Sequence, residues 1–174
     1  MTLPLHIGFT GTQAGMTDRQ KERVWQLVGH RQFYAHHGDC IGADAEFDAI
    51  VRRAPNLYGV IMHPCDLAAK RAYCVPKYPH DVVRDVKSPL VRNEDIVAEG
   101  HCLIAASKTA GPVLRSGTWA TIRLAVAAQK PVCVLFPDGG MMYPTPGVTW
   151  PGPEFDGSKQ TSPCMPKREK DWCD

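Results

Sequence analysis

Four consecutive residues, Arg115-Ser116-Gly117-Thr118, combine the groups that bind a phosphate at the start of a helix. The first amides of a helix have no intrahelical acceptors, and the positive end of the helix dipole attracts anions. Glycine lets a phosphate approach the backbone, the two hydroxyls can donate hydrogen bonds, and Arg115 adds charge. A plain helix cap at Ser116 or Thr118 explains the same residues, so the tetrapeptide alone leaves both interpretations open.

The motif stands between two apolar runs of strand length, at 101–106 and 131–136. Each run is bounded by turn-forming residues, which is typical of a buried strand. From 117 to 129 apolar residues recur at helical spacing, which predicts a helix there. The motif therefore joins a strand to the helix that leads to the next strand.

The rest of the chain alternates in the same way. Apolar runs predict strands at 5–9, 33–36 and 57–63, and helices are expected from Thr17, through Phe47 and from Ser88-Pro89. Residues 65–87 form a long polar crossover. We expect an α/β, Rossmann-like three-layer sandwich with a mainly parallel sheet. The first loop lacks the Gly-x-Gly-x-x-Gly fingerprint, so neither NAD nor FAD, nor any other cofactor, is expected.

The loop between the second strand and its helix is rich in residues typical of functional sites. It runs His36-His37-Gly38-Asp39-Cys40-Ile41-Gly42-Ala43-Asp44. Asp44 as a helix N-cap and glycines in turns account for part of it. A metal would use His36, His37, Asp39 and Cys40, but adjacent histidines seldom face one ion. A zinc set of His63, Cys65, Cys74 and His80 matches none of the usual spacings. No metal site is expected.

The length and composition of the chain exclude several classes of protein. The 174 residues are 44% hydrophobic and 22% charged, with a net charge of only +2. This size suits one domain, and the low charge argues against affinity drawn mainly from nucleic-acid phosphates. No apolar run is long enough to span a membrane, and no export signal is recognised at the start. Seven cysteines without a Cys-x-x-Cys pair fit reduced thiols, so we expect a cytoplasmic protein with no membrane partner.

From residue 138 the composition changes. Proline and glycine make up about one third of the last part of the chain, which indicates irregular structure. Tyr143, Trp150 and Phe155 are more aromatic residues than a disordered tail needs. We therefore divide the chain into a folded domain, 1–137, and an irregular Pro/Gly-rich C-terminal extension, 138–174, whose aromatic residues are expected to pack on something.

Three segments together resemble the SLOG superfamily, which contains the Smf/DprA proteins and the Lonely-Guy (LOG) phosphoribohydrolases. They are Gly8-Phe9-Thr10-Gly11-Thr12, His37–Asp44 and Arg115–Thr121, in the order and spacing of that superfamily. The resemblance covers residues 5–137 and implies a parallel-sheet nucleotide-binding domain that self-associates into a homo-oligomer. It implies one crevice lined by Gly11, Thr12, Gly38, Asp39, Gly42, Asp44, Arg92, Asn93, Ser116, Gly117 and Thr118, with Arg115 and Thr121 flanking it.

The sequence departs from LOG enzymes at one position. Their Pro-Gly-Gly-x-Gly-Thr-x-Glu motif ends in a glutamate that takes part in cleaving the N-glycosidic bond, and Ala120 stands at the matching place here. The first hypothesis is therefore a protein that binds a nucleotide or nucleotide-derived ligand as a sensor or sequestering module. The second is a nucleotide N-glycosidase in which Asp39, Asp44 or Glu94 replaces the glutamate. The third is Smf-like binding of single-stranded DNA.

Overall fold

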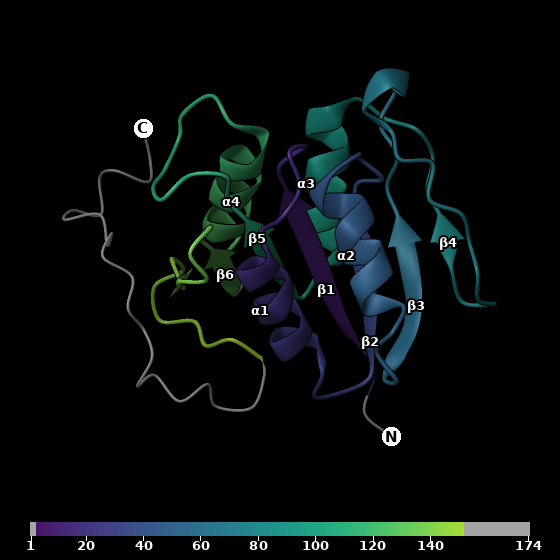
Figure 1. Cartoon of the computed structure of the whole chain (residues 1–174), viewed down its shortest axis with the longest axis horizontal. Helices are drawn as coiled ribbons and strands as arrows, with labels where there is room; N and C mark the ends of the chain where they lie inside the picture. The colour runs from purple at the N-terminus through teal and green to yellow at the C-terminus, as the bar shows by residue number, and fades with distance from the viewer. Residues whose placement is uncertain (1–2, 152–174) are drawn as a thin grey trace.

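The computed structural model describes residues 3–151, and its centre is a seven-stranded, mostly parallel sheet (Figure 1). The strand order is β4-β3-β2-β1-β5-β6-β7. The strands are β1 (Leu5–Gly11), β2 (Phe33–His37), β3 (Leu57–Met62), β4 (Val82–Val83), β5 (Cys102–Ala106), β6 (Val132–Leu135) and β7 (Met141–Met142). Only β7 runs antiparallel to its neighbour. After β4 the chain crosses to the other side of β1 and continues with β5, so the strand order reverses between β1 and β5. Open α/β sheets bind their ligands at such a reversal, beyond the carboxyl ends of the strands.

Four helices cover the two faces of the sheet, as expected for a three-layer sandwich. They are α1 (Asp18–Val28), α2 (Ala43–Val51), α3 (Pro89–Glu99) and α4 (Gly117–Ala127). One core cluster joins α1 and α2 to one face, and a second joins α3 and α4 to the other. The alternation of side chains along each strand sends odd and even residues to different clusters. The Rossmann-like α/β fold expected from the sequence is therefore confirmed.

Helix α1 begins as its sequence predicts. Thr17 and Gln20 form a complete capping box, with each side chain accepting from the other residue's amide. The buried Gln20 amide also donates to the carbonyls of Ser107 and Leu135, at 2.8 and 2.9 Å. This side chain therefore ties the start of α1 to the ends of β5 and β6.

Helix α2 begins differently from the expectation. Its N-cap is Gly42, which has a φ of +83° and no capping side chain, and Asp44 lies inside the first turn. The prediction of Asp44 as the cap was wrong because its carboxylate instead accepts from the Cys40 amide, at 3.2 Å. The crossover after β3 also contains more structure than predicted, namely the short 3-10 turn Ala68–Lys70 and strand β4.

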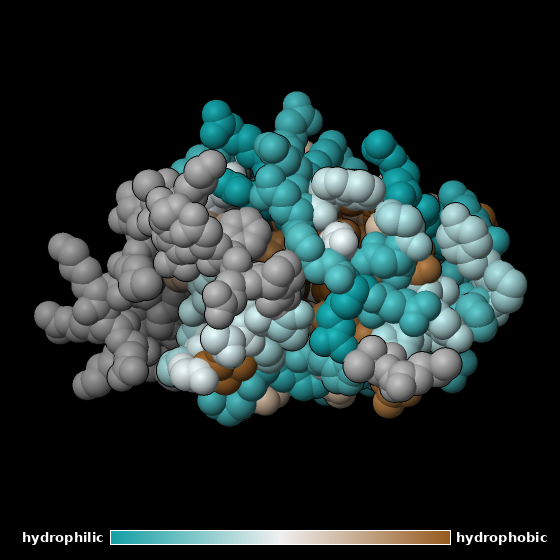
Figure 2. Space-filling model, turned by 90° about the horizontal axis from the view of Figure 1, so that it is seen from below, coloured by the Kyte–Doolittle hydropathy of each residue, from teal (hydrophilic) through white to brown (hydrophobic). Residues whose placement is uncertain are grey.

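Part of the C-terminal extension packs on the domain. Strand β7 adds to the sheet beside β6, and Tyr143 and Trp150 pack against the core under α1 and α2. Phe155 lies outside the described residues. Among residues 3–151 no helix is both long and apolar enough to cross a membrane. The underside of the molecule is mostly hydrophilic where it is described, with hydrophobic residues in small separate spots (Figure 2).

Candidate functional site

A cavity of about 510 Å³ lies at the carboxyl edge of the sheet, between the loops that follow β1, β2 and β5. Its volume falls in the range of small-molecule sites. Nine of the residues expected to bind a ligand line it: Gly11, Thr12, Gly38, Asp44, Arg92, Asn93, Ser116, Gly117 and Thr118. Three helices, α2, α3 and α4, begin at this edge because each follows a parallel strand. Their positive dipole ends face the same region.

Two glycines bring β1 and α2 together at the floor of the cavity. A Cβ on Gly11 would come within 2.5 Å of the Cβ of Ala43, and a Cβ on Gly42 would come within 2.3 Å of the Gln13 backbone. The Ala43 amide donates to the carbonyl of Thr12, at 3.0 Å. The loop 10–13 is therefore held against the first turn of α2, and only glycine fits at either contact.

Arg92 reaches across the cavity from α3 to the loop after β2. Its Nη1 donates to the carbonyl of Gly38, and to that of His63 at 3.2 Å. Both Nη atoms lie near the Sγ of Cys40, at 3.7 and 3.6 Å, and the Nε has no hydrogen-bond partner among the described residues. Arg92 is only 7% exposed, so its guanidinium places a fixed positive charge at the cavity wall.

Burial favours the neutral forms of Asp44 and Cys40. Burial raises the pKa of the Asp44 carboxyl, although Arg92 and the amides of Cys40 and Gly38 act in the opposite direction. Burial also raises the pKa of the Cys40 thiol to about 11, and nearby Asp44 adds to this effect. The charge of Arg92 is therefore only partly offset, which favours an anionic ligand.

The start of α4 forms the opposite wall of the cavity. Ser116 is the N-cap, and its hydroxyl accepts from the amide of Trp119 at 3.4 Å. The amides of Gly117 and Thr118 belong to the first turn and have no intrahelical acceptor. A Cβ on Gly117 would meet no atom within 4 Å, so the space beside it is open. The helix cap at Ser116 is confirmed, and phosphate binding at the same helix end stays a prediction.

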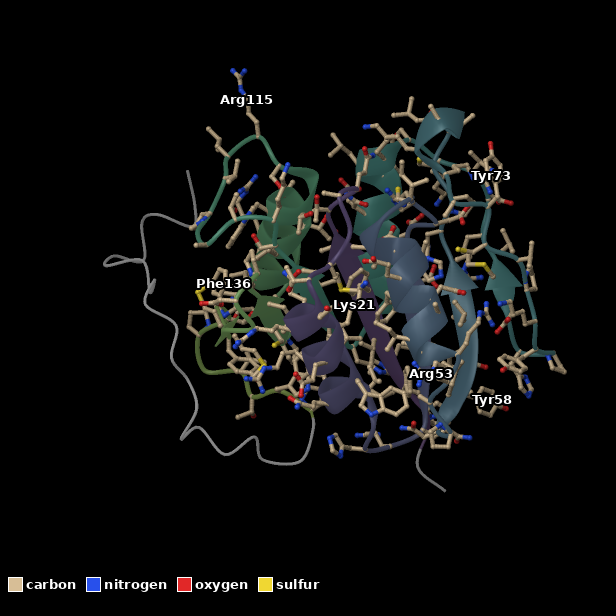
Figure 3. The ribbon with its side chains drawn as sticks, in the orientation of Figure 1. Lys21, Arg53, Tyr58, Tyr73, Arg115 and Phe136 are labelled. Atoms are coloured by element: carbon tan, nitrogen blue, oxygen red, sulfur yellow. The ribbon has the colours of Figure 1, made fainter. Side chains whose placement is uncertain are left out.

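Four of the expected ligand-binding residues do not line the cavity. Asp39 is buried and accepts from Arg71 and from the Cys74 amide, at 3.0 and 2.7 Å. Gly42 shapes the loop, and the Thr121 hydroxyl donates to the carbonyl of Gly117 within α4. Arg115 extends from the tip of its loop into solvent (Figure 3). Of the three carboxylates proposed as replacements for the LOG glutamate, only Asp44 lines the cavity, and Glu94 is exposed.

Several lining residues were not anticipated from the sequence. Lys108 and Thr109 follow β5 directly, so their position after a parallel strand could have identified them. Lys70 and Cys65 come from the crossover, where no pattern marks them. Together with Arg92, the two lysines give the cavity wall a positive balance against Asp44.

The histidines and cysteines considered for metal binding do not gather in either of the two sets weighed from the sequence. His36 and His37 point to opposite faces of β2 and belong to different clusters among the described residues. One cluster contains His63 and Glu99, and the other contains Asp48 and Cys74. The five cysteines of residues 3–151 are all unpaired thiols.

Two solved structures resemble this one. The molybdenum cofactor binding protein of the phototrophic bacterium Rippkaea orientalis matches with a TM-score of 0.54 and 20% sequence identity, over 78% of each chain. The structural-genomics target TM1055 matches with a TM-score of 0.50 and 18% identity, over 74% of this chain and 72% of its own. No protein-family model and no curated protein matches the sequence.

At these identities the likeness establishes the fold alone. Both neighbours support the Rossmann-like α/β fold described above. They do not show membership of a family, and they assign no ligand to this chain, because one fold hosts many activities.

Proposed function

We propose that this chain binds a phosphate-bearing, nucleotide-derived small molecule, with its phosphate at the N-terminus of α4. The observation that carries the proposal is the open space beside Gly117, a first-turn residue that lines the cavity and where no atom would meet a Cβ within 4 Å. An anion there accepts from the amides of Gly117 and Thr118 and gains the helix dipole.

The walls of the cavity support the same ligand. Three basic residues line the cavity, namely Lys108 after β5, Lys70 in the crossover and Arg92 on α3. The side chain of Asn93 lines the cavity and makes no hydrogen bond with the described residues. A buried amide with its donors and acceptor available can select the polar edge of a heterocyclic base. A cavity of about 510 Å³ favours a small molecule over a nucleic-acid strand.

Two ligand classes fit this description, and one experiment separates them. The first class is nucleoside phosphates, which the basic lining residues and Asn93 favour. The second is the molybdenum cofactor, which is the ligand named for the Rippkaea protein. The thiols of Cys40 and Cys65 both line the cavity, and soft sulfur suits a cofactor of that kind better than it suits a nucleotide.

The test is native mass spectrometry of the full chain, followed by calorimetry with a nucleoside monophosphate panel. The proposal expects one small molecule per chain that carries phosphorus. Molybdenum in the same fraction would select the cofactor, and its absence with bound nucleotide would select the nucleotide. A chain that binds neither class, but retains single-stranded oligonucleotides in a salt-dependent way, would contradict the proposal.

Hydrolysis of a nucleotide N-glycosidic bond is a second candidate function, and Asp44 favours it. This carboxyl lines the cavity, is 6% exposed and has its pKa raised by burial, as a general acid requires. It could protonate the leaving base while water attacks the sugar. Release of free base from a nucleoside monophosphate, lost in Asp44→Asn, would establish the enzyme. A bound but intact nucleotide after prolonged incubation would exclude it.

Self-association is part of the proposal. Strand β4 is an edge strand whose two residues, Val82 and Val83, are both exposed, so its outer side is open to a second strand. We expect a homo-oligomer in light scattering. A monomer at micromolar concentration, or an oligomer unaffected by Val83→Lys, would contradict this edge as the interface.

A further inference from the structure

Three side chains that lie outside the ligand cavity converge on the face of the sheet covered by α3. They are His36 from β2, His63 directly after β3, and Glu99 at the end of α3. The Nδ1 of His36 lies 3.0 Å from the Nε2 of His63 and 3.9 Å from a carboxylate oxygen of Glu99. The three ligand atoms all lie within 4.8 Å of one another.

Both imidazoles are in the protonation state that binds metals. His36 and His63 are 0% and 1% exposed. Burial, with the neighbouring histidines and Arg84 adding to it, lowers the pKa of His36 to about 2. Burial also lowers the pKa of His63 to about 4 against the opposing effect of Glu99. Both rings are therefore neutral at physiological pH, and a neutral ring presents one nitrogen lone pair.

Hydrogen bonding orients the first ring but does not satisfy the second. The Nε2 of His36 lies 2.8 Å from the Nδ1 of His6, which fixes the ring plane and leaves Nδ1 directed at the cluster. Such an outer partner is common for a metal-binding histidine. The Nδ1 of His63 is buried and has no hydrogen-bond partner among the described residues. This nitrogen can carry the proton of the ring when Nε2 binds an ion.

We propose that His36, His63 and Glu99 bind a divalent transition metal, with zinc as the ion that this ligand set suits best. Two histidines and one glutamate form a three-residue set that leaves a fourth position open. Glu99 has a side chain 33% exposed, so it provides the side from which the ion and a water molecule enter. The bound ion would tie together β2, β3 and α3.

The changes needed to admit the ion are small. Ligand nitrogens about 2.0–2.1 Å from a tetrahedral ion lie roughly 3.3 Å apart, close to the present separation of the two rings. The proton shared between the rings moves to the other nitrogen of His63. Arg84, which donates to Glu99 at 2.7 Å, must release the carboxylate. Arg84 is therefore a competitor of the metal.

The second cluster of potential ligands is already committed to internal bonds. The Nδ1 of His37 accepts from the Asp39 amide, so its Nε2 carries the proton and donates to Asp48, at 3.1 Å. The other oxygen of Asp48 accepts from Arg52, at 2.8 Å. Burial is the main cause that raises the pKa of the Cys74 thiol to about 12. This cluster serves as the internal control.

The test is a cobalt titration of the full chain after dialysis against a chelator. We expect one equivalent of Co²⁺ to give visible bands of a low-coordinate site without a thiolate charge-transfer band, and zinc to displace it. Glu99→Gln should weaken cobalt binding by at least about a hundredfold. Because Glu99 is partly exposed, this variant should stay folded by circular dichroism. His63→Gln should have the same effect on binding.

Two further variants test whether cobalt binds at this cluster and not at the second one. Cys74→Ser should leave cobalt affinity within about twofold, and Arg84→Ala should raise it, because the competing cation is gone. The proposal is overturned if no saturable binding occurs at about 10 μM cobalt. It is also overturned if Glu99→Gln binds cobalt as tightly as the wild type does, or if Arg84→Ala binds it no more tightly than the wild type. A thiolate band in the wild type that is lost in Cys74→Ser would overturn it as well.

Discussion

The guanidinium of Arg92 occupies the space that a side chain on Gly38 would need. A Cβ at position 38 would overlap the Nη1 of Arg92, and it would come within 2.9 Å of an Asp44 carboxylate oxygen. The same Nη1 donates to the Gly38 carbonyl. The absence of a side chain at 38 therefore allows α3 to place a buried cation in the cavity wall.

Gly38→Ala should therefore displace Arg92 and destabilise the protein. Overpacking at a buried site costs about 1–3 kcal/mol in the free energy of unfolding. Urea unfolding at neutral pH measures the change. Gly111→Ala is the matched control, since a Cβ there would meet nothing within 4 Å and its effect should be small. Equal stabilities of the two variants would contradict the packing of Arg92 against Gly38.

Lys108→Ala should weaken ligand binding more than Arg115→Ala does. Lys108 lines the cavity, whereas Arg115 is exposed at the tip of its loop (Figure 3). A charge-assisted hydrogen bond contributes about 1.5–3 kcal/mol, so its loss predicts roughly a ten- to hundredfold weaker complex. Calorimetry at two salt concentrations measures both variants. The opposite ranking would show that the Arg115 loop closes onto the ligand.

Asp44→Asn should change how stability depends on pH. The pKa of Asp44 is raised in the folded state, so the folded protein retains this proton above the unfolded value of 3.8. Wild-type stability from this group therefore falls as pH rises through the folded-state pKa, and then stays constant. Asparagine does not titrate, so Asp44→Asn removes this pH dependence. The stability of the variant relative to wild type should increase with pH in urea titrations, and a difference independent of pH would count against a raised pKa of Asp44.

Much of the fold could be predicted because local patterns determine it. The capping box of Thr17 and Gln20 and the helical spacing after Gly117 hold in the structure. Parallel strands carry the loops after them to one edge, and the resemblance to the SLOG superfamily implied that Gly11, Asn93 and Thr118 line one crevice. All three line the cavity at that edge. The same logic would have found Lys108.

The unpredicted features depend on contacts between segments that carry no local signal. Lys70 reaches the cavity because its carbonyl accepts from the Ile41 amide, which joins the crossover to another loop. Asp39 resembles a ligand-binding residue in sequence, yet it adopts a φ of +55° and binds Arg71. His36 and His63 meet only through the register of β2 and β3 and the face to which each points.

The most direct test of phosphate binding at α4 compares Gly117→Asp with Gly111→Asp. Neither position has an atom within 4 Å of an added Cβ, so both substitutions add the same charge without a clash. An acidic residue at a helix N-terminus is favourable for folding, so Gly117→Asp should unfold no earlier than the wild type. Calorimetry with the ligand identified by mass spectrometry should show Gly117→Asp weakened by roughly ten- to a hundredfold, with Gly111→Asp unchanged. Unchanged affinity in a folded Gly117→Asp would contradict the assignment.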